Sequence, residues 1–219
     1  HDSYKYKVPL HPNTKRFIFD WSKKIKINLS PESRLNKLFS EILTDSNDKF
    51  TLEMLNDIGI LSKIIPEFKN ILSQSQFDRY HVYTVDQHTL RAIYFLKKIK
   101  TEKNIQKNLV FAKSLLNLIS NKVPLFFAVL LHDIGKGLGG NHEKKGTRIA
   151  EKISKRMGLE DKDEIIWLVN NHSIYSEFAF NKDIEDISVI KKFVQKVNTI
   201  DRLKFLYLLT VVDIHAVND

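Results

Sequence analysis

Apolar residues in this chain recur mainly at intervals of three and four, which is the period of a helix with one buried face. The first clear stretch carries Leu35, Leu38 and Ile42 and follows a Ser-Pro pair at 30–31, where Pro suits the first helical position. The pattern then predicts short helices at about 50–58, 61–64 and 66–72. We interpret residues 31–80 as a small helical subdomain that packs against the segment after it.

Longer helices are expected from residue 85 onward. Asn141, Gly158 and Asp186 stand where helix caps are favoured. The last helix is apolar nearly all round, which is typical of a helix in the middle of a bundle. No convincing alternating strand pattern appears, so the sequence predicts an all-α fold with residues 81–219 as its main domain. The helices are expected at about 85–100, 108–119, 124–134, 142–157, 160–176, 186–197 and 201–217.

Residues 1–30 carry the weakest pattern. Apolar residues alternate with lysine until Pro9 and Pro12 break the run. We expect an irregular lead-in or linker here, in which residues 17–21 form a short strand or helix that anchors it. The chain starts at His1 and not at Met, so we expect it to be a piece of a longer protein.

Composition limits the classes of partner. The chain has 219 residues, 42% of them hydrophobic and 28% charged, as is usual for a globular domain. No apolar run is long enough to span a membrane and no signal segment opens the chain. The formal charge of +9 comes from scattered lysines without a stacking aromatic motif, which argues against a nucleic-acid partner. Absence of cysteine excludes disulfides and thiolate metal sites and is compatible with the cytoplasmic location that we expect.

The most informative stretch is the apolar run 126–131, which ends in His132 and Asp133. An adjacent imidazole and carboxylate suit a divalent metal that accepts nitrogen and oxygen ligands. Lys136 and a glycine-rich turn follow at once, and they suit a phosphate beside that metal. The alternative is a buried helix with a glycine cap and two incidental polar residues.

Other residues on the predicted helices extend this pattern: His88, His142, His172 and Asp213. Asp213 interrupts an apolar helix, and a buried carboxylate is costly unless it is paired or bound to metal. Each has an ordinary alternative, namely a salt bridge for Asp213, a helix-end or capping role for His172 and His142, and a satisfied core or surface position for His88. Together, the order His, His-Asp, His, His, Asp favours a metal centre.

That order resembles the HD-domain superfamily of metal-dependent phosphohydrolases. Over about 33–219 the chain is similar to the central domain of the bifunctional PII uridylyltransferase/uridylyl-removing enzymes. The most specific segments are Tyr83-Thr84-Val85-Asp86-Gln87-His88-Thr89-Leu90-Arg91 and Gly139-Gly140-Asn141-His142. The other similar segments are 55–68, 76–78, 81–82, 132–138, 167–169, His172 and 202–214.

The resemblance implies a hydrolase that removes UMP from a uridylylated tyrosine of a PII signalling protein. It implies one or two divalent ions, with Mn²⁺ or Mg²⁺ favoured and iron or zinc as alternatives. It also implies the ligands: His88, His132, Asp133 and Asp213 around the first ion, with Asp133 bridging to a second ion held by His142 and His172. No nucleotidyltransferase motif is present, so we expect the isolated hydrolase portion of such an enzyme.

Some positions depart from the family pattern. Gly135 stands where Ala is usual, Asn141 stands where Asp is usual, and 178–183 lacks the paired arginines that the family tends to carry. None of these changes removes an expected ligand. The last bears on substrate preference, because basic residues there could hold the nucleotide or the PII loop.

Three further residues are candidates for the chemistry. Lys136 would neutralise charge that grows on the phosphate. Arg91, one helical turn from His88, would do likewise or form a structural ion pair. His81 is a candidate acid or substrate contact, or a structural histidine. The competing functions are a general HD hydrolase of nucleotides or cyclic dinucleotides, a non-catalytic metal-stabilised module that docks to a PII-like protein, and a basic nucleic-acid binder.

Overall fold

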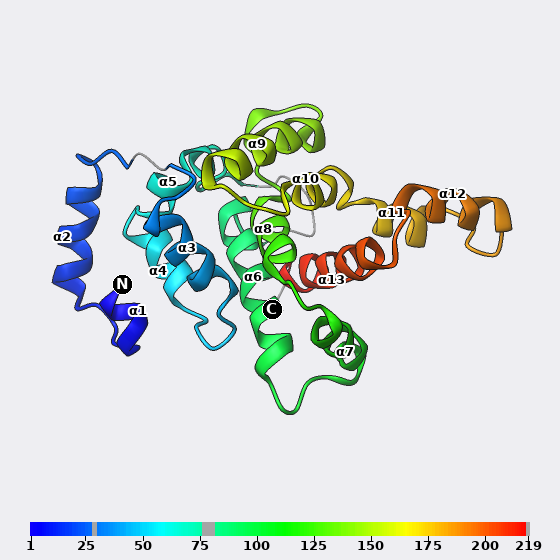
Figure 1. Ribbon diagram of the computed structural model, residues 1–219, viewed down its shortest axis with the longest axis horizontal. Coiled ribbons are helices and arrows are strands. Elements are labelled where there is room, and N and C mark those ends of the chain that lie inside the picture. Colours follow the sequence, from blue (N-terminus) through cyan, green and yellow to red (C-terminus); the bar gives the residue numbers. More distant parts are fainter. Residues whose placement is uncertain (28–29, 76–81, 218–219) are drawn as a thin grey trace.

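The computed structural model describes residues 1–27, 30–75 and 82–217, and every regular element in these ranges is a helix (Figure 1). The predicted all-α fold is therefore confirmed for this part of the chain. None of its helices combines the length and the apolar character that a membrane crossing requires. The first elements are α1 (Asp2–Tyr6), α2 (Pro12–Ser22), α3 (Arg34–Thr44), α4 (Thr51–Asp57), α5 (Leu61–Ile64) and the 3₁₀ turn η1 (Pro66–Asn70). The remainder are α6 (Val85–Thr101), η2 (Lys107–Leu109), α7 (Val110–Leu118), α8 (Val123–Leu131), η3 (Lys136–Leu138), α9 (His142–Met157), α10 (Lys162–Asn171), α11 (Ile174–Asn181), α12 (Ile187–Val197) and α13 (Ile200–Ala216).

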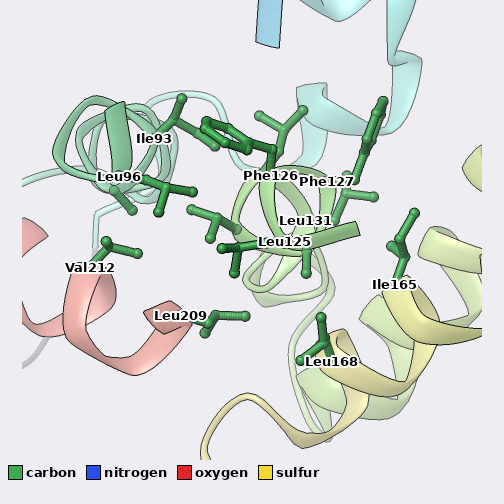
Figure 2. Close-up of a cluster of buried hydrophobic side chains, with 14 of the residues drawn as sticks. Ile93, Leu96, Leu125, Phe126, Phe127, Leu131, Ile165, Leu168, Leu209 and Val212 are labelled. Carbon is green, nitrogen blue, oxygen red and sulfur yellow. The ribbon is translucent and has the colours of Figure 1, made fainter. Parts of the chain in front are cut away.

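Helix α8 is the centre of the hydrophobic core. Every residue from Pro124 to Leu131 is buried, and α3, α6, α10 and α13 pack around them. Figure 2 shows side chains of α8 between those of α6, α10 and α13. Each buried Leu or Phe contributes about 1.5–3 kcal/mol relative to an exposed one, so α8 is held firmly along its whole length. The residues that follow Leu131 are therefore delivered to a fixed place.

Helix α13 also lies among several neighbours, as its apolar character predicts. It packs against α6, α7, α8 and α10, and Leu206, Leu209 and Val212 are buried. Its first turn is less enclosed, because Ile200 and Leu203 remain exposed. The buried part of α13 therefore begins near Leu206 and extends to Val212, directly before Asp213.

Two predicted helix ends are wrong, and a histidine lies at each. Helix α8 ends at Leu131 and not near residue 134, and the single helix expected at 160–176 is divided into α10 and α11. The rings of His132 and His172 donate through Nδ1 to the carbonyl oxygens of Val129 (2.7 Å) and Val169 (2.8 Å). A continuing helix would need those carbonyls for the amide four residues on, so the ring bonds replace the next helical bond.

The N-terminal segment is not irregular, which corrects the expected lead-in. Helices α1 and α2 occupy much of it and lie at one end of the molecule (Figure 1). Pro12 begins α2 instead of breaking structure, because a missing N–H costs nothing in the first helical turn. Phe17 and Trp21 on α2 stay exposed, which explains why the sequence shows no clear buried face there.

A buried lysine ties the segment 31–75 to the main bundle. Lys97 of α6 is only 1% exposed, and its Nζ donates to the carbonyl oxygens of Ile42 (2.8 Å) and Asp48 (2.6 Å). The Ile42 carbonyl lies in the last turn of α3, where a cation is favoured by the helix dipole. Phe39 of α3 also meets Phe127 of α8 edge to face, with ring centres 6.2 Å apart. The short helices therefore share one core with the bundle, while a domain boundary near residue 80 stays a prediction.

Candidate metal centre

Side chains from α6, the turn after α8, and α13 converge on one buried point. Nε2 of His88 lies 2.8 Å from Oδ1 of Asp213 and 3.9 Å from Oδ2 of Asp133. Nε2 of His132 lies 3.3 Å from Oδ2 of Asp133 and 3.4 Å from Oδ1 of Asp213. His88, His132 and Asp133 are at most 2% exposed, and the side chain of Asp213 is 31% exposed. One side of this group is therefore open.

A second group of donors lies against the first and shares Asp133 with it. Nε2 of His172 lies 3.9 Å from Oδ1 of Asp133, and the rings of His142 and His172 have centres 5.9 Å apart. In each of the groups His88–His132–Asp133 and Asp133–His142–His172, donor atoms lie within 4.8 Å of one another. The two oxygens of Asp133 thus face different groups, which is the arrangement of a carboxylate that bridges two ions.

The ring bonds that end α8 and α10 also orient two of these histidines. A carbonyl oxygen only accepts hydrogen bonds. Nδ1 of His132 and Nδ1 of His172 must therefore carry a proton, and each donates a hydrogen bond to the carbonyl oxygen of Val129 or Val169, respectively. In the neutral ring, Nε2 then keeps its lone pair toward the centre. This is the usual way in which a protein fixes the tautomer of a histidine that binds metal.

The electrostatics of the centre favour a bound cation. Burial alone would lower the pKa of His132, but the carboxylates of Asp133 and Asp213 outweigh it and raise that pKa to about 10. Burial would raise the pKa of both carboxyl groups, yet the hydrogen-bonded imidazoles hold each pKa well below its usual range, and for Asp133 Lys136 adds to the effect. Burial and the neighbouring His132 lower the pKa of His172. The carboxylates therefore require positive charge between the rings, as a proton or as a metal ion.

The residues present fit a divalent metal ion. Nε2 of His132 and Oδ2 of Asp133 are buried and lie 3.3 Å apart, and a cation held between such donors would offset the cost of burying these polar groups. Imidazole nitrogen and carboxylate oxygen in one site suit first-row divalent ions. The described part of the chain thus contains a cluster that can hold a metal.

The other candidates are placed differently. Nζ of Lys136 lies 2.7 Å from Oδ2 of Asp133, and the Lys136 side chain is one-quarter exposed, so it borders the centre. The guanidinium of Arg91 lies over the Tyr83 ring, with 4.1 Å between Cζ and the ring centre, and it lines a cavity of about 560 Å³ between α4 and α6. His81 lies outside the described residues.

Close packing of glycines shapes the turn that carries Lys136. A Cβ on Gly135 would lie 2.1 Å from the backbone oxygen of His142, and one on Gly137 would lie 1.7 Å from the backbone oxygen of Asn70. The first turn of α9 can therefore approach the His132–Asp133 turn only because position 135 lacks a side chain. Gly135 in place of the expected Ala thus has a structural counterpart in the placement of His142.

Some residues beside the expected ligands were not predicted from the sequence. The Ser173 hydroxyl donates to the carboxylate of Glu143, so the residues that follow His172 and His142 are joined. Nε2 of Gln74 donates to the carbonyl oxygen of Lys136 (3.3 Å). In the sequence, only the adjacency of Glu143 and Ser173 to predicted ligands could have drawn attention to them.

Comparison with known proteins connects this geometry to a family. Residues 85–204 match the family model described as "HD domain".

Proteins called "Bifunctional uridylyltransferase/uridylyl-removing enzyme" are similar to almost the whole chain. That of Azospirillum brasilense is 39% identical over 220 residues, covering 99% of this chain and 24% of the relative. That of Rhodospirillum rubrum is 36% identical over 218 residues, covering 98% and 23%. That of Caulobacter vibrioides strain NA1000 is 42% identical over 169 residues, covering 76% and 18%. The chain thus spans about a quarter or less of the length of these relatives.

Proposed function

Because the chain belongs to the HD domain family, we propose that it is a metal-dependent phosphodiester hydrolase that removes UMP from a uridylylated tyrosine of a PII signalling protein. The observation that carries the proposal is the convergence of two donor groups on Asp133. The uridylyl group follows from the relatives, whose name includes uridylyl removal. The PII protein as substrate and UMP as product follow from the resemblance of the sequence to that family.

The proposed ligands divide into two half-sites. His88, His132, Asp133 and Asp213 would hold one ion, and Asp133, His142 and His172 would hold the second. Mn²⁺ or Mg²⁺ is our preferred ion, and iron or zinc also suits these ligands. Divalent ions held here would supply Lewis-acid polarisation of the phosphate and lower the pKa of an attacking water.

Lys136 would act on the charge of the substrate. Its ammonium pairs with Oδ2 of Asp133 at 2.7 Å. A cation at the centre would compete for that oxygen, and the ammonium of this one-quarter exposed side chain would then be able to meet a phosphoryl oxygen. The leaving group, a tyrosine phenol with a pKa near 10, needs less protonation than an alkoxide would.

Arg91 and His81 have weaker support. Arg91 lies one turn from His88 on α6, with its guanidinium over the Tyr83 ring, and it stays a candidate for neutralising charge on the phosphate or for a structural ion pair. His81 stays a candidate acid or substrate contact. A cytoplasmic location and the absence of a nucleic-acid partner also remain predictions, supported by the lack of cysteine and the scattered lysines.

The deciding experiment is UMP release from a uridylylated PII protein by the 219-residue chain, with Mn²⁺ and with EDTA. We expect release only with metal, and none from the His132→Ala/Asp133→Ala variant. Metal-dependent hydrolysis of bis-p-nitrophenyl phosphate or a cyclic dinucleotide without UMP release would favour a general HD hydrolase instead. Unfolding on chelation with no turnover of any phosphodiester would favour the non-catalytic module.

A further inference from the structure

A hydrogen bond joins the residues that follow two of the proposed ligands. Glu143 comes directly after His142 at the start of α9, and Ser173 comes directly after His172 between α10 and α11. The Ser173 hydroxyl donates to Oε1 of Glu143 across 30 positions of sequence. A hydrogen bond to an ionised carboxylate is about twice as strong as one between neutral groups. The two ligand-bearing segments are therefore tied together at the metal centre.

His142 depends on such a tie more than His132 and His172 do. His132 and His172 are each oriented by a ring bond to a backbone carbonyl. Within the described ranges, the ring of His142 has no hydrogen bond of this kind, and the residue is half-buried at the first position of α9. Its distance from His172 is thus set by the placement of the first turn of α9.

Other contacts between α9 and α10 lie further along the two helices, away from His142. One turn further along α9, Oγ1 of Thr147 lies 3.1 Å from the side-chain amide of Asn170. Gly146 allows close packing there, since a Cβ would lie 3.4 Å from a methyl group of Val169. These contacts set the spacing of the helices. The Glu143–Ser173 bond joins the end that carries His142, which also packs against Gly135, to the segment that carries His172.

We propose that Glu143 and Ser173 are positioning residues that hold His142 and His172 at the separation needed for the second divalent ion. This inference rests on the proposed two-ion centre. Loss of an outer partner of a metal ligand typically weakens metal binding 10- to 100-fold. Breaking the bond should therefore lower the affinity for the second ion by that factor. The affinity for the first ion should stay almost unchanged, because its proposed ligands are His88, His132, Asp133 and Asp213.

The test is a titration of the metal-free chain with Mn²⁺. Calorimetry measures the binding, and the spin-coupled electron paramagnetic resonance signal reports paired Mn²⁺ ions. For Glu143→Ala and Ser173→Ala we expect a second ion bound 10- to 100-fold more weakly and a coupled signal that appears only at higher Mn²⁺. The double variant should resemble either single variant, because both remove the same bond. Circular dichroism and thermal unfolding establish that each variant is folded.

Two matched variants separate the bond from the charge of Glu143. Glu143→Gln removes the charge but keeps an oxygen that can accept a weaker hydrogen bond from Ser173, so it should bind the second ion more tightly than Glu143→Ala or Ser173→Ala does. Glu151→Ala removes an exposed carboxylate from the same helix, one paired with Lys155 at 2.7 Å, and should leave the binding of both ions unchanged. Loss of the second ion in Glu143→Gln with retention in Ser173→Ala would overturn the inference in favour of a simple charge effect.

The remaining outcomes distinguish the inference from the proposal beneath it. An unaltered chain that binds two ions, with Glu143→Ala and Ser173→Ala binding both equally well, would overturn the positioning role alone. An unaltered chain that binds fewer than two Mn²⁺ ions would overturn the two-ion centre itself.

Discussion

Nε2 of His88 lies 2.8 Å from Oδ1 of Asp213, although 125 positions of sequence separate the two residues. Helices α6 and α13 pack along each other, and this contact joins them at the metal centre. Most residues in this half of α13 are apolar, and the carboxylate of Asp213 meets His88 and His132 there. The pair therefore links the folding of the bundle to the assembly of the first proposed half-site.

Replacement of Asp213 by Asn should remove the first ion. The amide carries no negative charge to attract the cation. We therefore expect the affinity for Mn²⁺ to fall by more than the roughly 10- to 100-fold caused by losing a residue that only hydrogen-bonds to a ligand. Phosphodiesterase activity should fall with it. Asp201→Asn is the matched control, since Asp201 is an exposed carboxylate on the same helix that pairs with Lys204 at 2.9 Å. Calorimetric Mn²⁺ titration checks both. Equal affinities in the two variants would exclude Asp213 as a ligand.

Replacement of Lys136 by Ala should separate catalysis from metal binding. Its ammonium competes with a cation for Oδ2 of Asp133, so metal affinity should stay the same or rise. If the ammonium stabilises charge on the phosphate during reaction, kcat should fall about 100- to 1000-fold, as when one preorganised donor is removed. Steady-state kinetics and Mn²⁺ titration measure the two effects, with Lys144→Ala, an exposed lysine on α9, as control. A parallel loss of affinity would instead show a role in building the site.

Replacement of Gly135 by Ala should disturb the second half-site. The new Cβ would lie 2.1 Å from the backbone oxygen of His142, so the first turn of α9 must move. Overpacking of this kind costs about 1–3 kcal/mol, and we expect lower stability together with weaker binding of the second ion. Gly139→Ala separates the effects, because it carries the strain of a φ of +62° with no atom within 4 Å. Urea unfolding and Mn²⁺ titration would then show lost stability in both variants but a weakened second ion only in Gly135→Ala; weakened binding in both would exclude the clash as its cause.

Much of the helical bundle could be predicted because its signals are local. The helix over His142–Met157, with Asn141 before it and Gly158 after it, agrees with the prediction because cap residues mark both ends. The apolar run 126–131 likewise pointed to the two residues at its end, His132 and Asp133, which the structure places at the candidate metal centre. Metal-ligand residue types are also few, so their order along the chain was enough to nominate the set that the structure brings together.

The features that could not be predicted depend on contacts between distant segments. The ends of α8 and α10 lack Gly or Pro and are set by the rings of His132 and His172. The bond between Glu143 and Ser173 forms only because α9 and α10 cross beside the centre. Helix α2 was expected only in part, as a short strand or helix at 17–21, because Phe17, Phe19 and Trp21 remain exposed and no buried stripe distinguishes the helix.

The buried Lys97 predicts a specific dependence of stability on pH. Burial lowers its pKa to about 8, while Asp48 and Asp45 oppose the shift; the unfolded chain has a value near 10.4. Between these values the unfolded state binds more protons than the folded state, so stability rises with pH across this window. Below pH about 8 both states are charged, and the folded state bears the full penalty of burying the charge.

Lys97→Met removes this titration and leaves the other groups in place. The free energy of unfolding of the unaltered chain, relative to the variant, should rise by about 1–3 kcal/mol between pH 7 and pH 10.5, since each unit of pKa shift corresponds to about 1.4 kcal/mol. Urea unfolding of both proteins at several pH values measures this difference directly and cancels the tyrosines and surface lysines that they share. A difference that stays constant over the range would mean that Lys97 titrates normally, and that its bonds to the carbonyls of Ile42 and Asp48 offset the burial of its charge.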